Sequence, residues 1–431
     1  MASNQNPLSF PPEVIDQIID YNYDDIPTLQ SCALAFRSFL PSCRVHLFSE
    51  VVLVHNSAIR DCDMHGRLYS CEDFLQLLEE APWVATLVKA LELCGGYGVG
   101  IRSGSLFTER SCTDYYLPFI LLPSTLPKLN HLSLTGYYPA MKWDTLPQKL
   151  QDAVEMALSR PTLTQLDLVG IDFNAPSNLV AILSKAKAVK HFSFTNGLRF
   201  NTTGNVNVPV IPSNIPCLFQ LKSLGFAGRA IHLHEIYALT RGNPSRIDVT
   251  HVRELSVATE CMASSDSVDA LQSLLDNIGG SLEHLTLGLV SSPSKSLSID
   301  SNTNLRSVHV VCTSLEKHRH LLDIPFSGSI QTLIVDVGPG WDDNVLFAVN
   351  WQEFDTLFDS RAGSLTRIVI ILHCPHNRCG ERFCGGYSSI KENLLEQVEV
   401  QMPKLMARGI LWVKERRVRY TFGHRWMRDL P

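Results

Sequence analysis

The chain has 431 residues, of which 45% are apolar, so it is long enough for two or three average domains or for one long repeat array. Its net charge of −6 gives no reason to expect nucleic acid or an anionic membrane surface as the main partner. No apolar run reaches the roughly 20 residues that span a bilayer, and the N-terminus lacks the pattern of a secretory signal. We therefore expect the twelve cysteines to be reduced thiols in a cytoplasmic or nuclear protein.

The N-terminal segment has the pattern of short helices. Pro11 and Pro12 suit the first turn of a helix that extends to Ile19, and this helix contains two apolar pairs at i,i+4 spacing. Pro27 marks the start of a second helix, which Pro41 stops. The apolar positions of that second helix are Leu29, Cys32, Ala33 and Phe36.

This segment resembles an F-box, and it is most similar to the F-box-like modules of fungal proteins. The match covers about residues 8–53 and begins with the letters FPPEVIDQIID, followed by LQSCALAFRSFLPSCRVHLF. Phe10 stands where the family usually has Leu, and Phe39 where it usually has Trp; both keep a large apolar side chain.

The resemblance implies a three-helix module that binds the Skp-type adaptor of a cullin-based SCF ubiquitin ligase. The residues that fall in the adaptor-binding part of the motif are Phe10, Pro11, Pro12, Ile15, Ile18, Ile19 and Leu34. The alternative is that these helices only cap the N-terminal end of a repeat array, because solenoids need such caps.

One apolar pattern recurs through residues 54–431: apolar-x-x-apolar-x-apolar. Its ten copies begin at Val88, Leu129, Leu163, Val189, Leu221, Val252, Leu282, Leu305, Ile330 and Leu365, and Phe48 begins an earlier one. The alternation within each copy predicts a short strand with every second residue buried. Amphipathic helices are expected between copies, at 148–158, 178–189, 231–241, 268–278, 351–358 and 390–406.

Strand, turn and helix in repetition predict an α/β solenoid with parallel strands on a concave face and helices outside. Residues 54–431 resemble an irregular leucine-rich-repeat array of about ten strand–helix units. The Asn that standard repeats place after the strand is missing, which argues against a standard version.

The second residue after each opening apolar residue is expected to face outward from the sheet. Nine of these ten positions are polar, as a solvated concave face requires. The positions predicted to bind a target are His131, Gln165, His191, Glu254, His284 and Arg367. Their mixed chemistry suits a protein or peptide ligand, and the alternative is an ordinary polar sheet face without a ligand.

Residues 373–384 combine two histidines with three cysteines, which is enough to offer zinc four ligands. The candidate ligands are Cys374, His376, Cys379 and Cys384. Their Cys-x4-Cys-x4-Cys spacing does not match the paired knuckles of structural zinc sites. We therefore expect a loop of free thiols here, and we expect no metal or cofactor.

No combination of nucleophile, base and orienting group is readable in the sequence, so we do not expect an enzyme. The expected function is substrate recognition in an SCF-type ubiquitin ligase, with the N-terminal module on the adaptor and the solenoid on a protein target. The alternative is a stand-alone repeat scaffold for protein–protein interaction, without a role in ubiquitin transfer.

Overall fold

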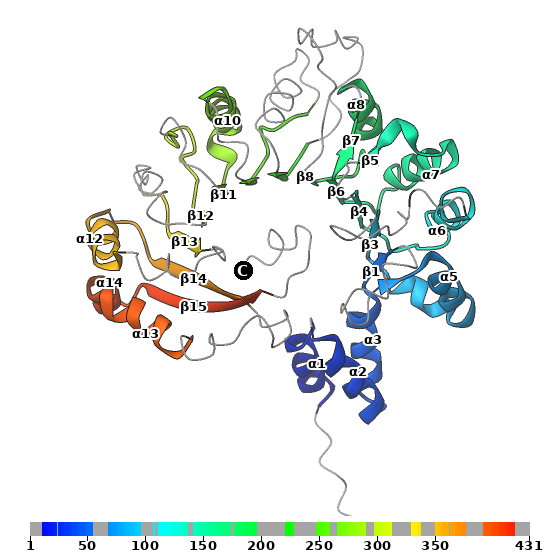
Figure 1. The fold of residues 1–431 in the computed structure, drawn as a ribbon, viewed down its shortest axis with the longest axis horizontal. Helices are drawn as coiled ribbons and strands as arrows, with labels where there is room; N and C mark the ends of the chain where they lie inside the picture. The colour runs from blue at the N-terminus through cyan, green and yellow to red at the C-terminus, as the bar shows by residue number, and fades with distance from the viewer. Residues whose placement is uncertain are drawn as a thin grey trace, which may run out of the picture. The chain divides into compact units, whose positions relative to one another are not determined.

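The protein has a mixed α/β fold with a large parallel sheet of 13 strands (Figure 1). The computed structural model describes residues 11–23, 25–54, 68–95, 107, 111–136, 141–173, 176–195, 220–227, 247–258, 265–289, 297–312, 329–337, 350–361, 363–375 and 391–418. The described residues divide into two compact units, of which the first ends at Val189 and the second begins at Lys190.

The first unit contributes five strands to the large sheet, in the order β2-β1-β3-β4-β6. Its strands are β1 (Glu50–Leu53), β2 (Leu68–Tyr69), β3 (Ala90–Cys94), β4 (His131–Thr135), β6 (Gln165–Val169) and the separate pair β5 (Met141–Lys142) and β7 (Ile171–Asp172). Its helices are α1 (Pro12–Tyr21), α2 (Ile26–Ala35), α3 (Leu40–Phe48), α5 (Cys71–Glu80), α6 (Leu117–Ile120), α7 (Gln148–Leu158) and α8 (Pro176–Lys185). Short 3-10 or π turns lie at η1 (Pro82–Thr86), η2 (Cys112–Tyr116) and η3 (Trp143–Thr145).

The second unit contributes eight strands, which follow one another in chain order from β8 to β15. They are β8 (His191–Thr195), β9 (Ser223–Ala227), β10 (Glu254–Ala258), β11 (His284–Leu289), β12 (Ser307–Cys312), β13 (Thr332–Val337), β14 (Arg367–Pro375) and β15 (Leu411–Val418). The helices are α10 (Ser265–Ile278), α12 (Trp351–Arg361), α13 (Lys391–Gln401) and α14 (Pro403–Ala407), with a 3-10 turn η5 (Gly279–Ser281).

Each predicted copy of the apolar pattern coincides with a strand. In β3, for example, Leu91 and Leu93 are buried while Ala90 and Glu92, which point to the other face, are partly exposed. Figure 1 shows the helices of each unit on one side of that unit's strands. The core of each unit therefore lies between its helices and the inward residues of its strands.

The strands keep a constant register because the residue before each strand binds its neighbour in the same way. The carbonyl of Lys222 accepts hydrogen bonds from the backbone N–H groups of Arg253 and Glu254, at 2.8 and 3.1 Å. The carbonyl of Lys89 binds Asn130 and His131 identically in the first unit. This repeated bond places equivalent positions of successive copies side by side.

Helices α7, α8, α10 and α12 lie close to predicted ranges, whereas α5 and α6 were not predicted. The helix expected over 390–406 is two helices, because Pro403 lacks the N–H needed to continue α13 and instead begins α14. The carboxylate of Asp355 accepts hydrogen bonds from the N–H groups of Lys404 and Leu405, both at 3.0 Å, and so caps α14. The helix expected over 231–241 lies outside the described residues.

Candidate functional site

The three N-terminal helices share a small core. It consists of Ile15 and Ile19 from α1, Ile26 and Leu29 from α2, and Cys43 from α3. Burial raises the pKa of the Cys43 thiol above its usual value, because the thiolate would lose its hydration there, and the nearby Cys32 adds to the effect. Ile15 and Ile19, two of the predicted adaptor-binding residues, are buried in this core.

The polar side of α1 faces α3. The carboxylate of Asp20 lies 2.7 Å from the Nε2 atom of His46, and Asp16 accepts a hydrogen bond from Ser42. The core residues occupy a second side of the helix, so a third side remains in solvent. That side carries three apolar residues at helical spacing, which we call the apolar stripe: Val14, Ile18 and Tyr21.

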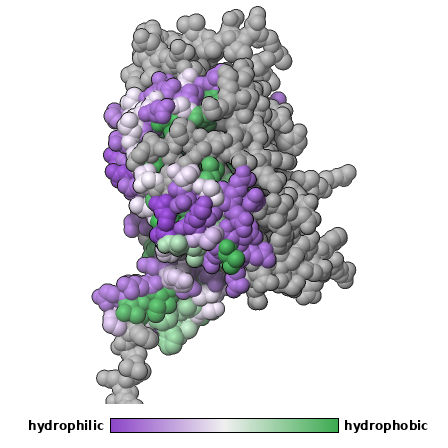
Figure 2. All heavy atoms as spheres, turned by 90° about the vertical axis from the view of Figure 1, so that its left-hand side faces the viewer, coloured by the Kyte–Doolittle hydropathy of each residue, from purple (hydrophilic) through white to green (hydrophobic). Residues whose placement is uncertain are grey.

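The end of α2 adds further exposed apolar surface. Leu34 is 90% exposed and Phe36, which follows the helix, is 60% exposed. Figure 2 shows apolar side chains gathered on the surface of the N-terminal helices, in the lowest coloured part of the view. Large apolar groups exposed together are typical of an interaction surface.

The predicted adaptor-binding residues are thus divided by the fold. Pro11, Pro12, Ile18 and Leu34 are exposed, and Phe10 lies outside the described residues. Tyr21 was not among the predicted residues, although it follows Ile18 by three residues and therefore shares its side of the helix. The same spacing rule could have found it.

Helix α3 connects this group of helices to the rest of the first unit. Phe48 packs edge to face on Trp83, with ring centroids 5.6 Å apart, and the guanidinium of Arg44 lies 4.2 Å from the centre of the same indole ring. The carbonyl of Ser49 accepts hydrogen bonds from Lys89 and Ala90. The chain therefore passes from α3 into β1 without a loose linker.

The predicted outward positions do lie side by side across the strands of each unit. Ala90 pairs with His131, and His131 pairs with Gln165, in the first unit. In the second unit the same row runs through His191, Ser223, Glu254, His284, Ser307, Thr332 and Arg367. Glu254 and His284 are exposed, and Gln165, His191 and Arg367 are partly exposed.

His131 differs from the expectation of a solvated position, because it is buried. Its Nε2 atom lies 2.6 Å from the carboxylate of Asp167 on the neighbouring strand, and both side chains are largely removed from solvent. The hydroxyl of Ser133 lies 3.4 Å from that of Thr135, which donates to Glu92. A nucleophile–base pair would require Ser133 to bind the imidazole, and its hydrogen bond goes to Thr135 instead.

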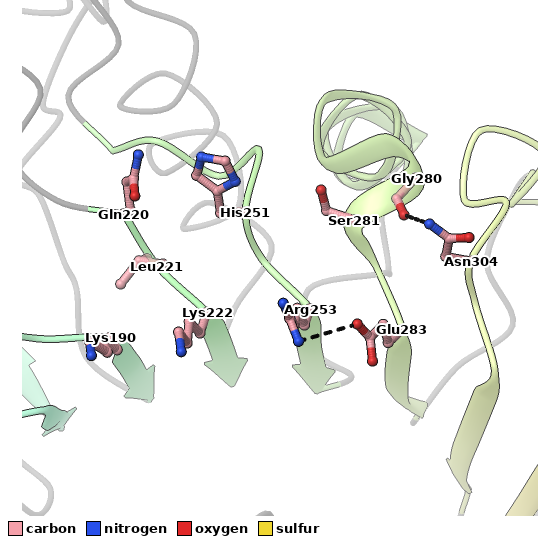
Figure 3. Close-up of a pocket in the computed structure, with 10 residues that line it drawn as sticks. All are labelled: Lys190, Gln220, Leu221, Lys222, His251, Arg253, Gly280, Ser281, Glu283 and Asn304. Carbon is pink, nitrogen blue, oxygen red and sulfur yellow. Dashed lines mark hydrogen bonds and ion pairs between the residues drawn. The ribbon is translucent and has the colours of Figure 1, made fainter.

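The second unit contains a pocket of about 460 Å³ at the amino-terminal ends of its strands (Figure 3). Its lining residues are Lys190, Gln220, Leu221, Lys222, His251, Arg253, Gly280, Ser281, Glu283 and Asn304. This pocket was not predicted from the sequence, although Lys190, Lys222, Arg253 and Glu283 each occupy the first position after the opening apolar residue of a copy.

A metal site is not among the features that the structure describes. Within the described ranges, no group of three His, Cys, Asp or Glu side chains could hold a metal ion. His376, Cys379 and Cys384 lie outside those ranges, so the expected loop of free thiols stays a prediction. None of the described helices combines the length and apolarity needed to cross a membrane.

Comparison with protein-family models finds no match for this sequence, and comparison with curated proteins finds none either.

Proposed function

We propose that this chain is a substrate-recognition subunit of an SCF-type ubiquitin ligase. Helices α1 to α3 would bind the Skp-type adaptor, and the sheet of the later copies would hold a protein target. The chain itself would make and break no bond. Its contribution would be effective concentration, because a target held near the charged ubiquitin carrier reacts as if the step were intramolecular.

The observation that carries the proposal is the exposed apolar stripe of α1. Ile15 and Ile19 already fill the core between the helices, yet Val14, Ile18 and Tyr21 also face water. A helix that only capped an array would not need this second apolar side. Leu34 and Phe36 add to the exposed apolar surface. The resemblance to an F-box implies that the partner of this surface is a Skp-type adaptor.

We also infer that the later copies form an irregular leucine-rich-repeat solenoid. Parallel strands begin at each copy of the pattern, and helices lie on one side of the strands within each unit. Such arrays use the face away from the helices to bind other proteins.

Co-purification with a Skp-type adaptor tests the proposal. The double variant Ile18→Asp/Leu34→Asp should abolish adaptor capture, because it places charge on apolar surface that binding would bury. The control Lys128→Gln/Lys187→Gln makes the same change of net charge at exposed residues of the first unit outside α1 and α2, and it should capture as much adaptor as the parent.

Circular dichroism must show unchanged helicity in both variants, since each substitution is at an exposed position. If Ile18→Asp/Leu34→Asp captures as much adaptor as the parent does, then the adaptor proposal is wrong. A scaffold without a ubiquitin role predicts that outcome.

A further inference from the structure

We propose that the pocket at the amino-terminal ends of β8 to β11 binds an acidic segment of a partner protein, through glutamate or aspartate carboxylates. The residues before five successive strands form what we call the edge row: Lys190, Lys222, Arg253, Glu283 and Arg306. This inference rests on one part of the proposed function, namely that the second unit binds a partner protein.

The backbone fixes the edge row in place. The carbonyl of Lys190 accepts from the N–H groups of Lys222 and Ser223, and the carbonyl of Arg253 accepts from those of Glu283 and His284. Neighbouring strands lie about 4.8 Å apart, so the row presents charged groups at short and regular intervals. Figure 3 shows Lys190, Lys222, Arg253 and Glu283 side by side at the strand starts.

The charge of the row is mostly uncompensated. Lys190, Lys222 and Arg306 are exposed, and within the described part of the chain none of them pairs with an acid. Arg253 makes the row's one such pair, at 3.6 Å from Glu283. Four cations against one acid make this edge a positive feature on a chain whose overall charge is negative.

The opposite wall of the pocket is polar and internally bonded. Asn304 donates to the carbonyl of Gly280 at 2.6 Å, Ser281 donates to the carbonyl of Thr250, and Thr250 is bound in turn to Asp248. Gln220 and His251 complete this wall (Figure 3). These internal hydrogen bonds hold the wall in a fixed arrangement, which lowers the cost of ordering it when a peptide binds.

The residues that line the pocket favour a peptide with carboxylates over a nucleic acid, a membrane surface or a single phosphate. The lining contains one imidazole, His251, and no Phe, Tyr or Trp on which successive nucleic acid bases could stack, and its one large apolar residue, Leu221, is buried, so no apolar surface is offered to a membrane. The cations are spread along a line and are not gathered around one point, which suits a run of single negative charges better than one doubly charged phosphate.

Binding of fluorescein-labelled peptides to the full chain, followed by fluorescence anisotropy, tests the proposal. The probe is a short peptide in which glutamate alternates with serine, and its matched control has glutamine at each glutamate. We expect the glutamate peptide to bind, the glutamine peptide not to bind, and the affinity to fall as salt is added.

The variant Lys190→Glu/Lys222→Glu/Arg253→Glu should weaken binding at least about tenfold, because it reverses the charges that face the peptide. The control Lys89→Glu/Lys128→Glu/Lys142→Glu makes the same change of net charge on exposed lysines of the first unit. Lys89 occupies the same position of the pattern, but its neighbours in the row are the uncharged Asn130 and Thr164. This control should stay within about twofold of the parent.

Equal weakening by both triple variants would show that only net charge matters and would overturn the assignment of the site. Preference for a peptide with phosphoserine, without affinity for the glutamate peptide, would overturn the choice of carboxylate. Adaptor capture, measured on the same proteins, should be unchanged by the edge-row variant. Failure of the peptide to bind would therefore contradict only the proposal for the pocket, and failure of the adaptor to bind would contradict only the proposed function of the N-terminal helices.

Discussion

The guanidinium of Arg253 lies 3.6 Å from the carboxylate of Glu283, the next residue of the edge row. Arg253 is well exposed, so the pair is screened by water and contributes less than about 1 kcal/mol to folding. The pair has a larger effect on the net charge of the edge row, because Glu283 is the one acid of the row and neutralises Arg253.

The substitution Glu283→Gln should therefore strengthen binding of the glutamate peptide by a few-fold and leave the thermal unfolding midpoint almost unchanged. Anisotropy and differential scanning fluorimetry measure the two quantities. Glu79→Gln, at an exposed position of α5, removes the same charge from the first unit and should change neither. An unchanged peptide affinity in Glu283→Gln would argue against a peptide on the edge row.

Adjacent isoleucines of α1 should respond in opposite ways to substitution. Ile19→Ala should lower the free energy of unfolding by about 2–5 kcal/mol, because Ile19 is buried in the helical core and its loss leaves a cavity. Ile18→Ala, on the exposed side, should change stability by no more than about 0.5 kcal/mol. Urea denaturation followed by circular dichroism distinguishes them, and equal effects would contradict the orientation of α1.

Removal of the His131 side chain should destabilise the first unit. His131→Ala takes away a partner of the buried Asp167 carboxylate, and we expect a loss of about 1–3 kcal/mol. Gln165→Ala, the next residue in the outward row and partly exposed, is the control and should cost far less. Chemical denaturation measures both, and a neutral His131→Ala would show that the buried pair does not support the fold.

Alkaline pH should weaken the N-terminal helices through Cys43. Burial raises the pKa of this thiol above its ordinary value of 9.0. The contribution of the buried neutral thiol to stability is therefore complete below pH 9 and is lost as the pH rises through the higher pKa of the folded state. Cys43→Ala should show a flatter fall of stability over this range.

The measurement is the unfolding midpoint of the N-terminal helices against pH, in the parent and in Cys43→Ala. Burial also raises the pKa of Tyr69, which acts in the same direction in both proteins, so the difference between the curves belongs to Cys43. Curves of identical slope would contradict this account.

Deletion experiments on the N-terminal helices should keep the residues that join α3 to β1. Removing residues 1–50 would take away Ser49, whose carbonyl binds β3, together with the Phe48 contact on Trp83. Loss of solubility after that deletion would not distinguish an adaptor-binding module from a structural cap. Removing residues 1–38 preserves these contacts. This shorter deletion therefore distinguishes better between an adaptor-binding module and a structural cap.

The sequence by itself determined the positions of the strands that begin at copies of the apolar pattern, and it predicted most of the helices between the copies, but β2, β5, β7 and β15 begin at no copy. The apolar-x-x-apolar-x-apolar pattern is local, and each copy buries the same side of one short strand, so its meaning does not depend on distant residues. The range 148–158 was predicted as a helix and is α7. The break between α13 and α14 also has a local cause, Pro403, but the apolar residues of 390–406 follow a helical pattern across it.

Only the tertiary structure decided which surfaces are free. Val14/Ile18 and Ile15/Ile19 have the same i,i+4 spacing, and the packing of α2 and α3 determines that the second pair is buried. His131 is buried because Asp167 lies on the next strand, 36 residues along the chain. The edge row forms because parallel pairing brings together single residues that are 23 to 32 positions apart in sequence, which no local periodicity reveals.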